Sequence, residues 1–148
     1  MNVWAGVIGD NLIGPYVFPA RVNSATYLEF LNNTLDELLD VPLDIRRNMW
    51  YLHDGAPPHS SREVNRWFND NYFDGWIGRY SKHAWPPRSP DLNVCDFYLW
   101  DHLKQIVYST PVNSLDELQV RLLNAAKEIR RNNPLLSVTS STKHVTSC

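Results

Sequence analysis

The sequence predicts an α/β fold, a sheet flanked by helices, from three observations. A chain of 148 residues with 43% hydrophobic and 20% charged side chains has the composition of one globular domain. Two β-rich runs open the chain, and apolar positions at helical spacing follow them. Residues 49–52 then form a continuous apolar run, which is typical of a strand covered on both faces of an α/β sheet. Strand and helix signals therefore alternate along the chain.

The first predicted elements form a hairpin. Residues 2–8 and 12–18 are rich in β-forming side chains and are separated by Gly9-Asp10-Asn11, which tolerate positive φ in a tight turn. Asp10 is therefore expected at the tip of the turn.

A helix is predicted next. Asn23 or Ser24 can cap its start, and Pro42 ends it. Its apolar positions keep helical spacing and are predicted core residues: Tyr27, Leu28, Leu31, Leu35, Leu38 and Leu39.

Asp54 follows the apolar run of residues 49–52, so it is expected at the tip of a strand. In open α/β sheets, ligands bind just beyond the carboxyl ends of the strands, which makes a carboxylate here a candidate functional group. The alternative is that Asp54 only begins a turn with Gly55, as a bare Asp-Gly pair often does.

More elements follow this strand. Residues 57–58 are both proline, and Ser60-Ser61-Arg62-Glu63 predicts a capping box for a short helix through Phe68. Residues 76–78 predict a further strand. Residues 85–90 contain three prolines and are predicted to be extended.

Two further helices complete the predicted domain. Asp96 precedes a helical stripe and is expected at a helix N-terminus, where the dipole favours the ionised carboxylate that a metal requires. Ser114-Leu115-Asp116-Glu117 is a second capping box, opening a last helix that runs to Arg131. We predict a domain over residues 1–132 and a disordered tail over residues 133–148.

Overall charge does not indicate a nucleic-acid-binding protein, because the formal net charge is −2 and the pI is about 6.2. The charge is uneven, however. Several basic side chains flank the segments around Asp54 and Asp96, which allows either a basic neighbourhood or an ordinary mixed surface: Arg46, Arg47, Arg62, Arg66, Arg79, Lys82 and Arg88.

Two cysteines, Cys95 and Cys148, are too few for a disulfide scaffold, so an intracellular setting is expected. No apolar run approaches the length of a membrane span, and no membrane partner is predicted.

Two motifs carry a resemblance to a known family. The first is Asp54-Gly55-Ala56-Pro57-Pro58-His59 at a strand end, and the second is Ser89-Pro90-Asp91-Leu92-Asn93-Val94-Cys95-Asp96 before a helix. Together they resemble the catalytic core of the mariner-type transposases, in the DDE/D superfamily of ribonuclease-H-like integrases. The resemblance covers about residues 2–132. It implies a ribonuclease-H-like mixed sheet flanked by helices, and metal-dependent phosphodiester cleavage and strand transfer on DNA.

By this resemblance, Asp54 matches the family's second catalytic carboxylate and Asp96 the third. Both are then expected to be catalytic and to bind Mg²⁺ or Mn²⁺, hard cations that prefer oxygen ligands. Asp91 matches a motif position that is not a metal ligand.

The family's first catalytic Asp stands on the first strand, which is central in the sheet. Residues 2–6 match the strand after it, so we expect the first strand to be missing, the chain to be truncated at the N-terminus and cleavage to be lost. The hairpin and the Asp54 strand would then lack the partner between them and leave backbone groups unpaired. Asp10, at a hairpin tip, is at the wrong place to substitute.

Three more residues are predicted nucleic-acid contacts. His59 matches the family motif beside the site, where it orders the loop or contacts substrate. Trp85 and Arg88 could stack on a base and meet a phosphate, although Trp85 could equally anchor its loop on the core. The resemblance implies DNA as the partner, transposon ends or nonspecific duplex, together with a homodimer and a nuclear location. The alternative function is a non-catalytic interaction module that keeps the transposase fold.

Overall fold

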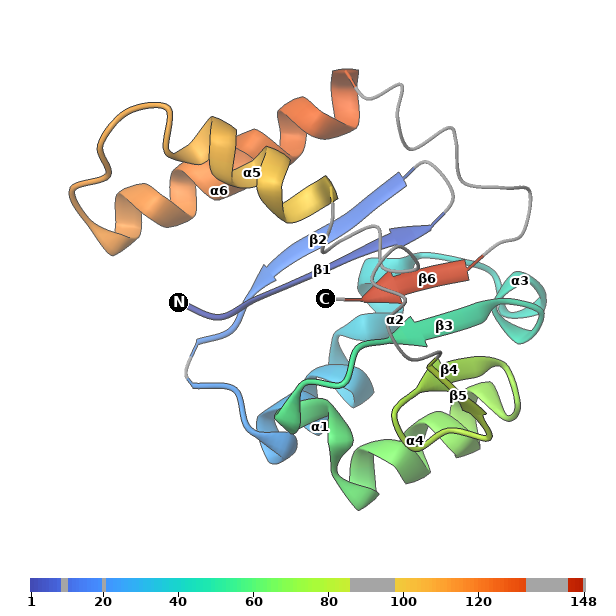
Figure 1. The fold of residues 1–148 in the computed structure, drawn as a ribbon. Coiled ribbons are helices and arrows are strands. Elements are labelled where there is room, and N and C mark those ends of the chain that lie inside the picture. Colours follow the sequence, from blue (N-terminus) through green and yellow to red (C-terminus); the bar gives the residue numbers. More distant parts are fainter. Residues whose placement is uncertain (9–10, 20, 86–97, 133–143, 148) are drawn as a thin grey trace.

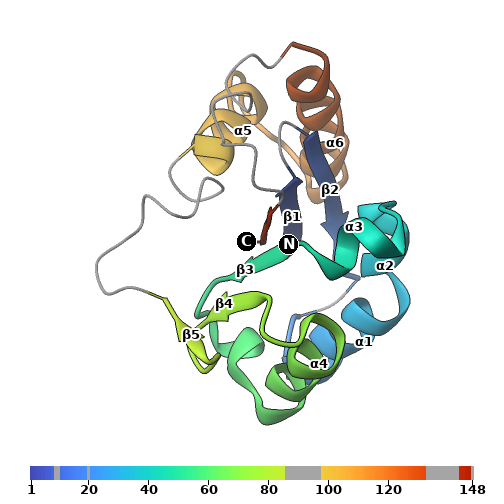
Figure 2. The ribbon, with the colours of Figure 1, turned by 90° about the vertical axis from the view of Figure 1, so that its right-hand side faces the viewer.

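The structure is a computed structural model that describes residues 1–8, 11–19, 21–85, 98–132 and 144–147. One six-stranded sheet, with the strand order β2-β1-β6-β3-β4-β5, runs through the middle of the molecule (Figure 1). Helices α5 and α6 lie apart from α1 and α4, with β1 between the two groups, and the view turned by 90° agrees (Figure 2). The predicted α/β class is therefore confirmed.

The predicted hairpin is present. Strand β1 (Val3–Ile8) pairs antiparallel with β2 (Asn11–Val17), and the register shifts between Trp4 and Gly6. Gly14 faces this irregularity with a φ of +82°, and a Cβ there would lie 3.2 Å from the carbonyl oxygen of Trp4. Only glycine fits that position without strain. Asp10, predicted at the turn tip, lies outside the described residues.

The helix predicted after the hairpin is broken into two. Helix α1 (Ser24–Asn33) begins at the predicted cap Asn23, whose side chain accepts from Thr26 N, but it ends at Thr34. Helix α2 (Leu35–Leu39) follows, and a third helix, α3 (Leu43–Arg47), begins after Pro42. The break falls where Asn-Asn-Thr, three poor helix formers, interrupts the apolar pattern.

The Asp54 strand and its surroundings largely follow the prediction. Strand β3 (Trp50–His53) pairs parallel with β4 (Trp76–Gly78), and β4 pairs parallel with the short β5 (His83–Ala84). Between them lie a 3₁₀ turn (Pro57–Ser60) and α4 (Arg62–Tyr72). The capping box predicted from Ser60 is shifted by one residue, since Ser61 is the cap and its hydroxyl accepts from Val64 N at 3.2 Å.

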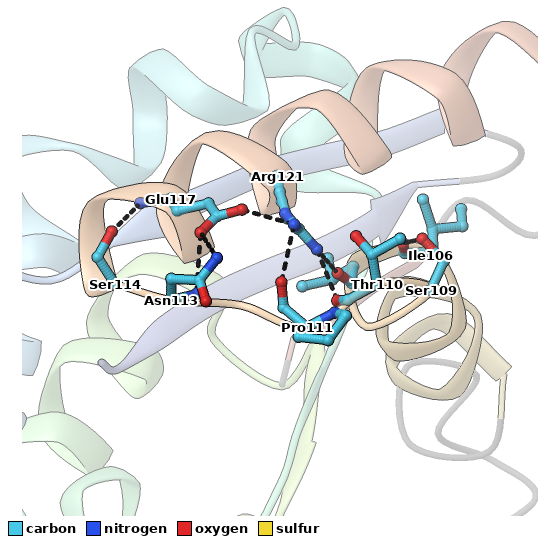
Figure 3. Close-up of polar contacts among 9 residues, drawn as sticks. Ile106, Ser109, Thr110, Pro111, Asn113, Ser114, Glu117 and Arg121 are labelled. Atoms are coloured by element: carbon cyan, nitrogen blue, oxygen red, sulfur yellow. Dashed lines mark hydrogen bonds and ion pairs between the residues drawn. The ribbon is translucent and has the colours of Figure 1, made fainter.

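Helices α5 (Trp100–Val107) and α6 (Leu115–Asn132) pack on each other. Ser114 caps α6 as predicted, because its hydroxyl accepts from the N–H of Glu117. Arg121 of α6 donates to the carbonyl of Val107 at the end of α5 and to the carbonyls of Thr110 and Pro111 in the loop between the helices (Figure 3). None of the described helices is long and apolar enough to cross a membrane.

Two hydrophobic clusters cover opposite parts of the sheet. One lies under α1, α2 and α4 and includes Trp4, Tyr51 and Trp76; the other lies under α5 and α6 and includes Ala5 and Val7 of β1. Neighbouring residues of β1 thus enter different clusters, as expected of a strand with both faces covered.

Residues 144–147 correct the prediction for the tail. They form strand β6 (His144–Ser147), which lies between β1 and β3 and pairs antiparallel with β1 and parallel with β3 (Figure 1). The expected disorder does not hold for these four residues, and the expected gap in the middle of the sheet is filled. The physical reason is that the backbone N–H and C=O groups of β1 and β3 need hydrogen-bond partners, which β6 supplies. Residues 133–143 and 148 lie outside the described residues.

Candidate active site

Asp54 lies at the carboxyl end of β3, as predicted. Strands β3 and β4 are parallel, with Tyr51 opposite Trp76 and Leu52 opposite Ile77. The residues that follow the two strands, Asp54 and Arg79, therefore emerge at the same edge of the sheet. The position that a Cβ on Gly55 would take is 3.8 Å from Cδ of Arg79, so this side chain lies beside the Asp54 turn.

One oxygen of the Asp54 carboxylate is held by two donors. The backbone N–H of Ala56 donates to Oδ1 at 3.0 Å, and Nδ1 of His59 makes a short hydrogen bond to the same oxygen. The 3₁₀ turn makes this possible, because Pro57 and Pro58 favour its backbone angles and the N–H of His59 donates to the Ala56 carbonyl at 2.9 Å. The turn thus folds His59 back onto Asp54.

The charge state of Asp54 follows from these contacts. Burial by itself raises the pKa of the Asp54 carboxyl. The hydrogen bond from His59, the charge of His59 and the hydrogen bond from the Ala56 N–H outweigh burial, so the pKa of Asp54 is lowered below its ordinary value. Asp54 is therefore ionised at neutral pH and can only accept hydrogen bonds. It follows that Nδ1 of His59 carries the proton that it shares with Asp54.

His59 in turn rests on two buried aromatic side chains. Its ring lies 4.2 Å from the Tyr27 ring and 4.5 Å from the His53 ring, centroid to centroid. The hydroxyl of Tyr27 and Nε2 of His53 are hydrogen-bonded at 2.9 Å. Burial, and secondarily the charge of His59, hold the pKa of His53 well below its usual range, so His53 is a neutral core histidine.

Of the other predicted site residues, the structure describes Trp85 but not Asp96 or Arg88. Asp96 and Arg88 lie outside the described residues, so their predicted roles stay predictions. Trp85 is half-buried just after β5, a position that leaves both of its proposed roles open. Sequence reasoning placed Tyr27 in the core only, because helical spacing reveals burial and not the hydrogen bond to His53.

The described residues contain one of the two predicted metal ligands, Asp54. No group of three His, Cys, Asp or Glu side chains that could hold a metal ion occurs among residues 1–8, 11–19, 21–85, 98–132 and 144–147. Asp54 nevertheless fits a hard cation, since it is an ionised carboxylate, about one quarter exposed, whose two described hydrogen bonds both end on Oδ1.

Comparison with known proteins agrees with this chemistry. The family model described as DDE superfamily endonuclease matches residues 2–119, which is most of the chain and includes Asp54 and Asp96. No curated protein matches the chain. Endonucleases of this family generally use a divalent metal and act on DNA. The mixed sheet flanked by helices, the carboxylate at the end of β3 and the family match together establish that this chain belongs to the DDE superfamily endonucleases and carries a transposase-type nuclease core of ribonuclease-H-like fold.

Proposed function

We propose that the chain binds DNA and carries a core for metal-dependent phosphodiester cleavage, in which Asp54 and Asp96 would hold Mg²⁺ or Mn²⁺; the predicted loss of cleavage is part of this proposal. The observation that carries this proposal is the held carboxylate of Asp54 at the carboxyl end of a parallel strand, the edge where α/β sheets bind their ligands.

Each nearby side chain has a defined part in this proposal. Asp54 supplies an ionised carboxylate as the ligand. The hydrogen bond from Nδ1 of His59 holds this carboxylate in one orientation. Arg79, beside the same turn, is placed to meet a phosphate oxygen. A divalent cation held there would neutralise charge on the phosphate oxygens as the bond breaks. Asp96 is the predicted second metal ligand. Trp85 and Arg88 are predicted DNA contacts.

The finer features of this function rest on the motifs Asp54 to His59 and Ser89 to Asp96. They support a mariner-type subclass, transposon ends as the recognised DNA, strand transfer after cleavage, a homodimer as the working unit and a nuclear location. Each of these belongs to the proposal.

The test is nicking of supercoiled plasmid DNA in the presence of Mg²⁺ or Mn²⁺. The predicted loss of cleavage implies little nicking by the unchanged chain, and any nicking that it does show should disappear in Asp54→Asn and in Asp96→Asn. Asp70→Asn is the matched control, because Asp70 is an exposed carboxylate on α4 away from the β3 edge. Equal cleavage by Asp54→Asn and Asp70→Asn would overturn the proposal.

A second candidate function is DNA binding without cleavage. It is favoured by β6, which lies beside β3 but brings His, Val, Thr and Ser and no carboxylate to the sheet. This candidate predicts no nicking by any variant, together with duplex binding that weakens steeply as salt rises. A chain that neither cuts nor binds in a salt-dependent way would instead act as a non-catalytic interaction module.

A further inference from the structure

The inference concerns Tyr80, which comes just after the carboxyl end of β4. Its side chain is 59% exposed, although the ring is large and mostly apolar. Arg79, the residue before it, lies beside Gly55 in the Asp54 turn. Tyr80 therefore belongs to the turn that leaves β4 at the edge of the sheet where Asp54 lies.

The turn that carries Tyr80 is held by hydrogen bonds on both sides of it. The N–H of Ser81 donates to the Gly78 carbonyl at 3.3 Å, and the N–H of Gly78 donates to the hydroxyl oxygen of Ser81 at 3.2 Å. The Ser81 hydroxyl donates in turn to the carbonyl of His83. The backbone around Tyr80 is thus fixed before a ligand arrives, which lowers the entropic cost of binding there.

Arg79 covers one face of the Tyr80 ring. Its guanidinium carbon lies 5.4 Å from the ring centroid, within the range of a cation–π contact. Because more than half of the side chain is exposed, the opposite face of the ring is left open to solvent. The pair therefore presents a flat aromatic surface that is backed by a positive charge.

A nucleobase fits this surface. Every base has a flat π-face that stacks on an aromatic side chain, and this stacking depends little on sequence. The phosphate attached to the base complements Arg79, whose N–H groups can donate from the edge of the guanidinium while its face rests on the ring. A base inside a duplex is paired and stacked on its neighbours, so it has to leave the helix before it can stack on a side chain. The surface therefore favours an unpaired base.

We propose that Tyr80 stacks on an unpaired base of DNA bound beside Asp54, so that the preferred DNA carries a single-stranded overhang. This inference rests on the proposed DNA-binding function and deepens it, because it names the form of DNA that the site takes. It requires neither a bound metal nor cleavage.

The experiment measures the affinity of the full chain for two fluorescently labelled DNAs by anisotropy, over a salt series. One DNA is a blunt duplex, and the other is the same duplex with a single-stranded overhang. A third sample carries 2-aminopurine as the first unpaired base of the overhang. Stacking on an aromatic ring quenches the fluorescence of 2-aminopurine, so this base reports the proposed contact directly.

The unchanged chain is compared with Tyr80→Ala, Tyr80→Phe and Tyr108→Ala. The alanine variant at Tyr80 removes the ring, whereas Tyr80→Phe keeps it. Tyr108 is the matched control, because it is 60% exposed, as Tyr80 nearly is, but follows α5, which packs on α6 away from β4 (Figure 1).

We expect the unchanged chain to bind the overhang DNA more tightly than the blunt duplex. Tyr80→Ala should lower the affinity for the overhang DNA by about 5- to 150-fold, the effect of losing one stacked base, and should abolish the quenching. Its affinity for the blunt duplex should not change. Tyr80→Phe and Tyr108→Ala should keep both the preference for the overhang and the quenching.

The blunt duplex distinguishes failure of this inference from failure of the proposed function. If the chain binds both DNAs equally, or if Tyr80→Ala keeps the preference for the overhang, the inference is overturned and the proposed DNA binding stands. An equal loss in Tyr108→Ala overturns it as well, because the effect is then not specific to Tyr80. If neither DNA is bound in a salt-dependent way, the proposed function fails and the inference fails with it.

Discussion

His59 hydrogen-bonds through Nδ1 to Oδ1 of Asp54, five residues earlier in the chain, while its ring packs on the buried rings of Tyr27 and His53. The direction of the carboxylate at the end of β3 is therefore set by the core beneath it. His59 links the two, since one side of the imidazole contacts the site and its faces contact the core.

Replacing His59 tests this link. His59→Ala removes one of the two donors to Oδ1, so we expect the Asp54 carboxylate to lose its fixed direction and Mn²⁺ affinity to fall by about 10- to 100-fold, as for other groups that orient a metal ligand. Isothermal titration calorimetry with Mn²⁺ measures the change. His83→Ala is the control, because His83 lies exposed on β5 and should leave Mn²⁺ affinity unchanged. An unchanged Mn²⁺ affinity in His59→Ala would show that His59 does not position the Asp54 carboxylate for the metal.

The buried state of His53 predicts a pH dependence of stability. Burial lowers the pKa of His53 in the folded chain, whereas the unfolded chain binds a proton near the ordinary value of about 6.5. Below that pH the unfolded state holds more protons than the folded state, so the free energy of unfolding falls as the solution is acidified. Urea denaturation at pH 7.5 and at pH 5.5 should show a lower midpoint in acid.

The variant His53→Gln identifies the source of this dependence. Glutamine does not titrate, so the difference between the two pH values should shrink, even though the variant is less stable overall because its contact with Tyr27 is altered. A pH dependence as steep as that of the unchanged chain would show that another group is responsible.

Arg121 predicts a stability effect far from the site. Its guanidinium donates to the carbonyl of Val107, the last residue of α5, and to those of Thr110 and Pro111 in the loop that follows, and the Asn113 N–H and Arg121 together lower the pKa of Glu117 (Figure 3). Arg121→Ala should reduce the free energy of unfolding by about 1–2 kcal/mol, the loss expected when charged donors leave carbonyls that water can partly reach. Arg121→Lys should recover only part, because a single ammonium lacks the planar fork of donors. An alanine variant as stable as the original would contradict this role.

Arg79 predicts a change in DNA affinity. If it meets a phosphate beside Asp54, Arg79→Ala should weaken duplex binding and reduce the slope of log K against log salt by about one. Fluorescence anisotropy over a salt series measures both. Arg66→Ala serves as the matched control, since Arg66 is an exposed base on α4. Equal slopes for the two variants would separate Arg79 from the DNA-binding surface.

Local sequence patterns predicted the elements around the site. The apolar run before Asp54 became β3, residues 76–78 became β4, and the Ser114 cap opened α6. Each of these carries its signal within a few residues. The break between α1 and α2 was missed because the apolar spacing continues across Thr34, although the backbone does not.

Strand β6 shows what local patterns leave out. His-Val-Thr-Ser is short and mostly polar, and the surrounding Ser/Thr-rich sequence suggests no strand. Its pairing depends on backbone groups of β1 and β3, which come far earlier in the chain. The hydrogen bond between Tyr27 and His53 likewise joins residues that are 26 positions apart in the chain, so no local pattern reveals it.

The most direct measurement of the central claim is paramagnetic broadening by Mn²⁺ in the ¹H–¹⁵N spectrum of the full chain. We predict that substoichiometric Mn²⁺ first broadens the amide signals of residues 53–56 and of Arg79, and that Asp54→Asn abolishes this local effect while Asp70→Asn preserves it. Broadening centred on another part of the chain, or broadening near β3 that persists in Asp54→Asn, would contradict the assignment of Asp54 as the metal-binding carboxylate.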